Sequence, residues 1–94
     1  MAVVVVSRWK GSYEQALPIL REASPIMKEA GATSVVAGVC LAGPETDLIY
    51  TASTYPDLAA YERSRGNASF RRVFAEFLKV VQVQDRSIIV GEEL

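Results

Sequence analysis

The sequence contains no histidine, and this absence removes several common chemistries. A neighbouring imidazole usually activates a serine or cysteine nucleophile, so neither the serines nor Cys40 has the partner that a hydrolase of this type needs. No carboxylate or cysteine cluster has the spacing of metal ligands, so we predict neither a zinc site nor a non-haem iron site. The six glycines are scattered, and none forms a phosphate loop or a dinucleotide-binding fingerprint. We predict no metal and no cofactor.

An excess of positive charge and long apolar runs are also missing. The 94-residue chain has a net charge of −1, so it lacks the surplus of Lys and Arg that attracts nucleic-acid phosphates. The Val3–Val6 run is too short for the apolar core of a signal peptide, and no stretch approaches the ~20 residues of a membrane span. The single cysteine cannot form an intrachain disulfide. We therefore expect a cytoplasmic protein that binds neither nucleic acid nor membrane.

Apolar residues are plentiful: 50% of the chain is hydrophobic and only 22% is charged. A chain of this length is typical of one domain with one core, so we expect residues 1–94 to form a single domain. A small domain has a large solvent-exposed surface relative to its volume. We therefore expect part of its apolar surface to meet a partner.

The first half of the chain predicts a strand, a helix and a second strand. Residues 3–9 are apolar on both alternating faces up to Ser7, which is typical of a central strand. Apolar residues then recur at helical spacing from an N-cap at Ser12 to an end at Gly31. Pro18 and Pro25 lie inside this pattern and each removes a backbone donor, so we expect this helix to be kinked or to begin later than Ser12.

The second half predicts a hairpin, a second helix and a last strand. Residues 33–42 and 48–55 are strand-like on either side of a polar turn at 43–47. Pro56-Asp57 ends the returning strand and supplies an N-cap, and Gly66-Asn67 interrupts the helix that follows. Residues 83–90 form the last strand. A regular apolar stripe marks the most strongly patterned part of the helix: Phe70, Val73, Phe74, Phe77, Leu78 and Val81.

This order of elements predicts an α+β, ferredoxin-like β-α-β-β-α-β domain with a four-stranded antiparallel sheet and two helices on one face. Both faces of the 33–42 strand carry apolar or small side chains, but the helices can cover only one face. A second copy related by a two-fold axis is the simplest cover for the other. We therefore predict a homodimer that pairs through the sheet face.

Two stretches of the second helix carry a family resemblance. The sequence Tyr55-Pro56-Asp57-Leu58-Ala59-Ala60-Tyr61-Glu62, followed by Phe70-Arg71-Arg72-Val73-Phe74-Ala75-Glu76-Phe77, resembles the equivalent region of NIPSNAP-like and antibiotic-biosynthesis-monooxygenase-like proteins. The resemblance implies a dimeric α/β barrel with a ligand cavity between sheet and helices. That superfamily includes cofactor-independent monooxygenases, haem-degrading enzymes and lactone isomerases. Haem-degrading relatives rely on an Asn, a Trp and a His, so the lack of histidine argues against that activity.

The resemblance makes side chains near this cavity the first candidates for ligand binding. Trp9 ends the first strand, where an indole is able to stack on a planar substrate and donate one hydrogen bond; alternatively it is a packed aromatic at a rim or interface. Tyr50 and Tyr61 are able to orient a substrate through their hydroxyls. Alternatively, their rings pack in the core and their hydroxyls contact water. The full set of candidates is Trp9, Tyr50, Tyr61, Arg65 and Asn67.

Arg65 and Asn67 flank the break in the second helix. Arginines cluster there, and a guanidinium is suited to clamping a carboxylate or an enolate, although a solvated helix face explains the cluster as well. Asn67 is able to bind a substrate oxygen or, instead, to cap the helix that follows it.

Three functions remain open at this point, and no catalytic residue is assigned. The first is a homodimer that binds a small hydrophobic or aromatic molecule between sheet and helices. The second is a cofactor-independent monooxygenase, in which Trp9 and the tyrosines hold an aromatic substrate while Arg65 and Asn67 stabilise a developing anion. The third is a non-catalytic structural or protein-interaction module, whose mark would be a filled space beneath the helices.

Overall fold

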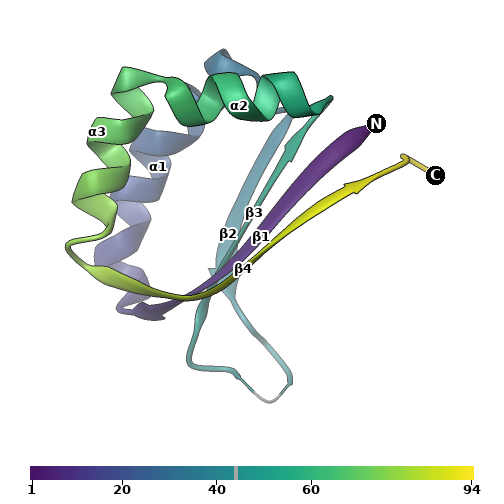
Figure 1. Ribbon diagram of the computed structural model, residues 1–94. Helices are drawn as coiled ribbons and strands as arrows, with labels where there is room; N and C mark the ends of the chain where they lie inside the picture. The colour runs from purple at the N-terminus through teal and green to yellow at the C-terminus, as the bar shows by residue number, and fades with distance from the viewer. Residues whose placement is uncertain (44) are drawn as a thin grey trace.

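The computed structural model describes residues 1–43 and 45–94 (Figure 1). The elements follow the predicted order, with the second helical segment broken into two helices at Asn67. They are β1 (Ala2–Gly11), α1 (Tyr13–Ala30), β2 (Ser34–Val39), β3 (Ile49–Tyr55), α2 (Leu58–Gly66), α3 (Ala68–Phe77) and β4 (Val81–Gly91).

The four strands form one antiparallel sheet in the order β2-β3-β1-β4, so the first strand is central, as predicted. All three helices lie on one side of it (Figure 1). Along β1 the side chains alternate: Val3, Val5, Ser7 and Trp9 are buried, and the residues between them are only partly buried. This alternation defines a helix-covered face and an open face of the sheet. In the described ranges, no helix is both long and apolar enough to cross a membrane.

The first helix differs from the expectation about its prolines. It begins at Tyr13, directly after Ser12, whose hydroxyl accepts a hydrogen bond from Gln15 N, and it runs through Pro18 and Pro25. A later start is therefore wrong. The carbonyls that lose their donors belong to Glu14 and Arg21, which are both exposed, so water is able to satisfy them.

The end of this helix is fixed by a close approach to α2. Gly31 has a positive φ of 137°, and its N–H bonds to the carbonyl of Lys28. A side chain at this position would meet the backbone and side chain of Ala60 at 3.1–3.4 Å. Glycine therefore suits both the left-handed backbone and the narrow space.

Two predicted boundaries are wrong. The second strand is shorter than expected, since Val39 is its last residue to pair with β3, opposite Ile49. The predicted turn at 43–47 includes Pro44, which lies outside the described residues. The apolar stripe of the second helix is also shorter: α3 ends at Phe77, and Val81 pairs with Gly11 as the first residue of β4. Val81 is buried in the core, so burial alone did not reveal that the backbone had changed from helix to strand.

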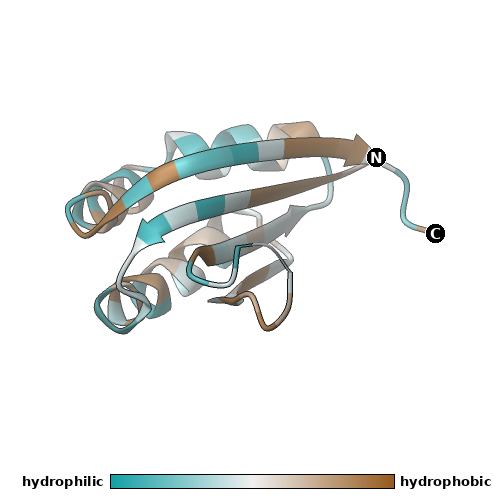
Figure 2. Cartoon of the chain, turned by 90° about the horizontal axis from the view of Figure 1, so that it is seen from below, coloured by the Kyte–Doolittle hydropathy of each residue, from teal (hydrophilic) through white to brown (hydrophobic). Residues whose placement is uncertain are grey.

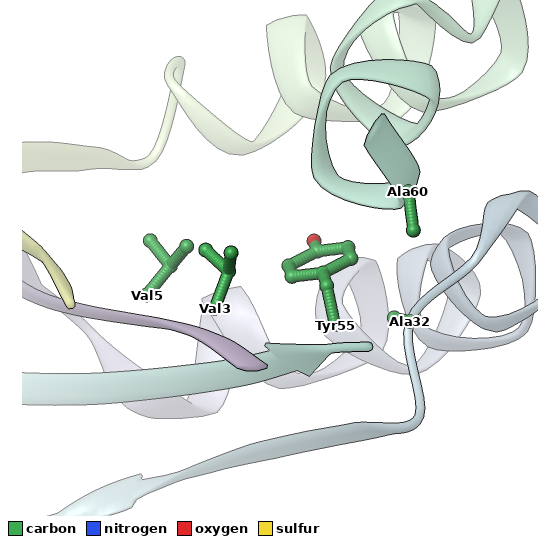
Figure 3. Packing of buried hydrophobic residues seen from close by; sticks show 5 residues of the cluster. All are labelled: Val3, Val5, Ala32, Tyr55 and Ala60. Carbon is green, nitrogen blue, oxygen red and sulfur yellow. The ribbon is translucent and has the colours of Figure 1, made fainter. Parts of the chain in front are cut away.

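Two groups of buried side chains hold the helices on the sheet. One contains Val3, Val5, Ala32, Tyr55 and Ala60; Figure 3 shows Val5, Val3 and Tyr55 in a row above the sheet, with Ala60 pointing down from α2. The other contains Trp9, Ala16, Ile49, Phe77 and Val81. Burial of side chains of this size contributes about 1.5–3 kcal/mol for each large one.

The open face of the sheet and the outer strand β4 expose apolar side chains. Val36 on β2 is 62% exposed and Ile89 on β4 is 52% exposed, and by register both lie on the same face as Val4 and Val6. The paired ends of β1 and β4 are strongly hydrophobic (brown in Figure 2). This is the surface that the sequence predicted to need a cover.

Candidate functional site

A cavity of about 80 Å³ lies between the sheet and the helices. Its lining is mainly apolar and comes from both groups of core residues as well as from all three helices. Six aromatic side chains take part: Trp9, Tyr55, Tyr61, Phe70, Phe74 and Phe77. The volume suffices for several water molecules and is smaller than the ~300–1,000 Å³ of typical sites for drug-sized ligands. The space beneath the helices is therefore not filled, and it suits a small molecule.

Trp9 forms one wall of this cavity and is held in a fixed orientation. Its side chain is 3% exposed, and its Nε1 donates a hydrogen bond to Thr51 Oγ1 at 2.9 Å. The rings of Phe77 and Phe74 meet it edge-on, with centroids 4.8 and 6.0 Å away. The indole N–H that we expected to bind a substrate is thus donated within the protein. Trp9 offers a ligand its π surface rather than its N–H.

Tyr61 reaches the cavity from α2, as the sequence predicted, and meets a second tyrosine there. The rings of Tyr61 and Tyr55 are edge-on with centroids 5.3 Å apart, and both line the cavity. Tyr55 was not among the predicted site residues. Two strand serines, Ser7 and Ser53, add hydroxyl groups to the sheet side of the lining.

Two predicted candidates lie outside the cavity. Tyr50 pairs with Arg8 in the β1–β3 register, and the alternation of side chains puts it on the open face, opposite to its neighbour Thr51. Asn67 is the N-cap of α3, where its Oδ1 accepts a hydrogen bond from Phe70 N at 2.9 Å. Of the five candidates, the structure brings together Trp9, Tyr61 and Arg65, and separates Tyr50 and Asn67 from them.

Two arginines line one region of the cavity. Arg65 comes from the last turn of α2, and its guanidinium carbon lies 5.8 Å from the Phe74 ring centroid. Arg86 comes from β4, and its guanidinium carbon lies 5.6 Å from the Trp9 centroid and 5.8 Å from that of Phe74. Its Nε also donates a hydrogen bond to Ser7 Oγ at 3.1 Å. Both cations therefore rest on the aromatic lining.

The electrostatics around Arg86 disfavour its charge. Burial lowers the pKa of the Arg86 guanidinium below its usual value, and the positive charge of Arg65 lowers it further, against the opposing influence of Tyr61 and Tyr55. The cavity lining contains no carboxylate. Across residues 1–43 and 45–94, the ion pairs engage Arg8, Arg72 and Lys79, but neither cavity arginine. Two cations thus share a half-buried site in which no described residue is their acidic partner.

This lining restricts the chemistry of the site. Its polar groups are hydroxyls and guanidiniums, which are suited to holding an oxyanion and to orienting a substrate. No lining side chain is an ordinary general base at neutral pH, because the lining has neither a carboxylate nor an imidazole. No group of three or more acidic or cysteine side chains within the described ranges is placed to hold a metal ion.

Arg86 is the site residue that sequence reasoning missed. It lies in the predicted last strand and shares the parity of Ile88 and Val90, which was a usable signal for a common face. The pattern of that strand alone does not say which face meets the helices. The same limitation explains why Tyr50 was selected and Tyr55 was not, since both lie in the same predicted strand.

Comparison of the structure with known structures identifies the fold. It is similar to SnoaB, a cofactor-independent oxygenase from Streptomyces nogalater, with a TM-score of 0.81 and 9% identity over 99% of this chain and 95% of that one. It is also similar to Rv0793 from Mycobacterium tuberculosis, with a TM-score of 0.80 and 14% identity over 100% and 98% of the two chains. An antibiotic biosynthesis monooxygenase matches with a TM-score of 0.71 and 16% identity over 98% of each chain.

These similarities confirm the predicted ferredoxin-like fold over nearly the full chain, and the structures with this fold include a cofactor-independent oxygenase and an antibiotic biosynthesis monooxygenase. No protein-family model matches the sequence, and no curated protein matches it significantly. At such low identities the similarity establishes the fold, and the activity has to be argued from the site itself.

Proposed function

We propose that the protein binds a small aromatic molecule in the cavity between its sheet and helices. The observation that supports this most strongly is the aromatic lining of a cavity that the core leaves open, with the indole of Trp9 fixed at its wall. Aromatic side chains in such positions give a planar ligand offset-stacked and edge-on contacts. The small volume favours a single ring.

Binding is best tested through Trp9, because it is the only tryptophan and its indole N–H gives one unambiguous NMR signal. Benzamide, an uncharged single-ring probe, is expected to shift this signal in a saturable way. Ala23 lines the cavity and is buried, so Ala23→Leu should fill the space and weaken benzamide binding by about tenfold or more.

Ala75→Leu provides a matched control, since Ala75 is exposed on α3 and does not line the cavity. It should leave benzamide binding unchanged. A Trp9 signal that does not respond to benzamide at any concentration, or a response that Ala23→Leu does not weaken, would contradict the proposed function.

A second candidate function is that of a cofactor-independent oxygenase acting on an aromatic substrate. It is supported by the full-length similarity to SnoaB and by the two cations beside the cavity. Such cations would stabilise the phenolate or enolate form of a substrate, which is the electron-rich form that reacts with oxygen. The lining supplies no ordinary base, so the substrate would enter ionised or lose its proton to water.

Oxygen consumption separates this candidate from simple binding. An oxygenase should increase oxygen uptake by hydroquinone or related single-ring phenols, and Arg65→Met should reduce that increase. If the protein binds single-ring ligands but does not change oxygen uptake by any of these phenols, the binding function stands and the oxygenase function fails.

We also propose that two copies pair through the open face of the sheet. The support is the apolar surface formed there by Val4, Val6, Val36 and Ile89, which no helix of the described chain covers. An isologous pair would bury the same surface on both copies. The resemblance implies the same arrangement. A module whose only function is this interface is the less favoured alternative, because it would not need the cavity on the other face.

The cytoplasmic location stays a prediction. It rests on the single cysteine, and Cys40 is a free thiol in the structure, which suits a reducing compartment.

A further inference from the structure

We propose that the ligand of this cavity is an aromatic carboxylate, whose anionic group is held between the guanidiniums of Arg65 and Arg86. This inference rests on the proposed binding function and adds the charge of the ligand to it. It rests on the positions of the two arginines and on the lack of an acidic side chain among the described residues that line the cavity.

The two guanidiniums approach the same aromatic ring although they come from distant parts of the chain. Arg65 ends α2 and Arg86 lies in β4, yet each guanidinium carbon lies 5.8 Å from the centroid of the same ring, that of Phe74. Both side chains line the same cavity. The fold therefore concentrates two positive charges where helix and sheet meet.

No acidic side chain among the described residues neutralises these charges. The cavity lining has no acidic side chain, and the ion pairs of residues 1–43 and 45–94 lie elsewhere. Arg86 donates from Nε to Ser7 Oγ, and a guanidinium has five donors, so its terminal nitrogens remain for another acceptor. A carboxylate matches this planar set of donors and would supply the missing negative charge.

Structural explanations account for only part of this arrangement. A cation in the last turn of a helix interacts favourably with the helix dipole, which suits Arg65, but Arg86 lies in a strand. Contact with aromatic rings stabilises both cations, but it does not explain why the fold places two like charges together. Burial and the charge of Arg65 both lower the pKa of Arg86, so the positive charge on Arg86 is electrostatically disfavoured. Such unfavourable placements are typical of functional sites.

The aromatic part of the ligand has a natural place beside the charged group. The Arg86 guanidinium lies 5.6 Å from the centroid of Trp9, so a carboxylate held by Arg86 would bring an attached ring close to the indole. Tyr61 and Phe70 line the same cavity. A compact acid with one ring therefore fits the chemistry of both ends of the site.

The test compares benzoate with benzamide, which has nearly the same shape but no charge. Both are titrated into the wild-type protein, and binding is followed at the indole N–H signal of Trp9. We expect benzoate to bind about tenfold more tightly than benzamide, because a hydrogen bond to a charged group is stronger than one to a neutral group. Arg86→Met and Arg65→Met should each reduce this preference to about twofold or less, with little change for benzamide.

Two further variants and one control measurement make the test decisive. Arg86→Lys keeps the charge but not the planar fork, so it should retain part of the benzoate preference. Arg63→Met removes an exposed arginine of α2 that does not line the cavity, and it should behave as wild type. Circular dichroism confirms that each variant is folded, and if Arg86→Met does not fold, Arg65→Met carries the test.

The possible outcomes separate this inference from the proposed function. If benzoate and benzamide bind equally, the cavity binds aromatic molecules but the charge assignment is wrong. If the preference for benzoate survives in both arginine variants, the carboxylate is held elsewhere and the assignment is again wrong. If neither probe binds, the proposed function fails, and the inference fails with it.

Discussion

The arginines on the two faces of the sheet differ in whether they form ion pairs with carboxylates. On the open face, Arg8 lies between the carboxylates of Asp85 and Glu45 and pairs with both. On the helix-covered face, Arg65 and Arg86 lie together beside a cavity, without an acidic partner in the described chain. The difference shows that the open face pairs its arginine with carboxylates of the protein, whereas on the helix-covered face we propose that a ligand supplies the negative charge.

The two faces also differ in whether their apolar side chains are covered by the chain itself. The open face presents Val4 and Val6 on the central strand, with Val36 and Ile89 on its two outer strands. A second copy would cover this surface without leaving a cation unpaired, because Arg8 already has two carboxylate partners within the chain. The helix-covered face buries most of its apolar groups within the chain and leaves a space among them, while Ile88 and Val90 near the end of β4 stay about half exposed. This division is the basis for our two proposals, assembly through the open face and ligand binding on the other.

The largest effect is expected from a charge on the open face. Val6→Asp would place a carboxylate at the centre of the proposed dimer interface, where an unpaired buried charge costs about 3–5 kcal/mol. We expect the dimer dissociation constant to rise at least about a hundredfold, which light scattering coupled to gel filtration measures as a halved mass.

Leu78→Asp is the matched control for this variant. Leu78 is 47% exposed at the end of α3 and far from the sheet's open face, so its replacement should leave the mass unchanged. If wild type and Val6→Asp have the same mass, the open face is not the interface.

A smaller effect is expected from a pair of identical substitutions on the two faces of β3. Thr51→Val removes the acceptor of the Trp9 indole and leaves a buried N–H without a partner, which should lower the free energy of unfolding by about 1–2 kcal/mol. Thr54→Val changes the open face of the same strand, and it should change stability by less than about 0.5 kcal/mol. Urea denaturation measures both, and equal effects would show that Trp9 does not depend on this bond.

The smallest effect is expected from removing one arginine on each face. Arg8→Met breaks ion pairs whose side chains remain partly exposed, so it should lower stability by only about 0.5–1 kcal/mol. Arg86→Met removes a half-buried charge that no carboxylate balances, and it should not lower the melting temperature by more than about 3 °C. Both variants are compared by their melting temperatures. If Arg86→Met lowers the melting temperature more than Arg8→Met does, Arg86 serves the fold rather than a ligand.

The fold was predictable because its signals are local. Ser12 and Asp57 cap the helices whose starts they marked in the sequence. Asn67, which we selected as a ligand-binding candidate, caps α3 instead, as the alternative interpretation allowed. Residues 3–9 are apolar on both alternating faces up to Ser7, which correctly predicted a central strand, although within the chain only the face of Val3, Val5, Ser7 and Trp9 is buried. A cap or an alternating strand is decided by neighbouring residues, so one sequence suffices to find it.

The site was less predictable because it depends on contacts between distant strands. Arg86 reaches the cavity because β4 pairs with β1, in a register that shifts between Arg8 and Trp9. Tyr50 and Tyr55 belong to the same strand but lie on opposite faces, and only the β1–β3 pairing decides which one faces the helices. The local pattern of a single strand determines neither its partner strand nor its register.

The most direct test of the division between the two faces is a crystal structure of the protein grown with benzoate. We predict a second copy on the surface of Val4 and Val6, and a carboxylate bound by Arg65 and Arg86 with its ring beside Trp9. A structure in which the open face meets only solvent, or in which benzoate lies away from both arginines, would contradict the assignment of assembly to one face and anion binding to the other.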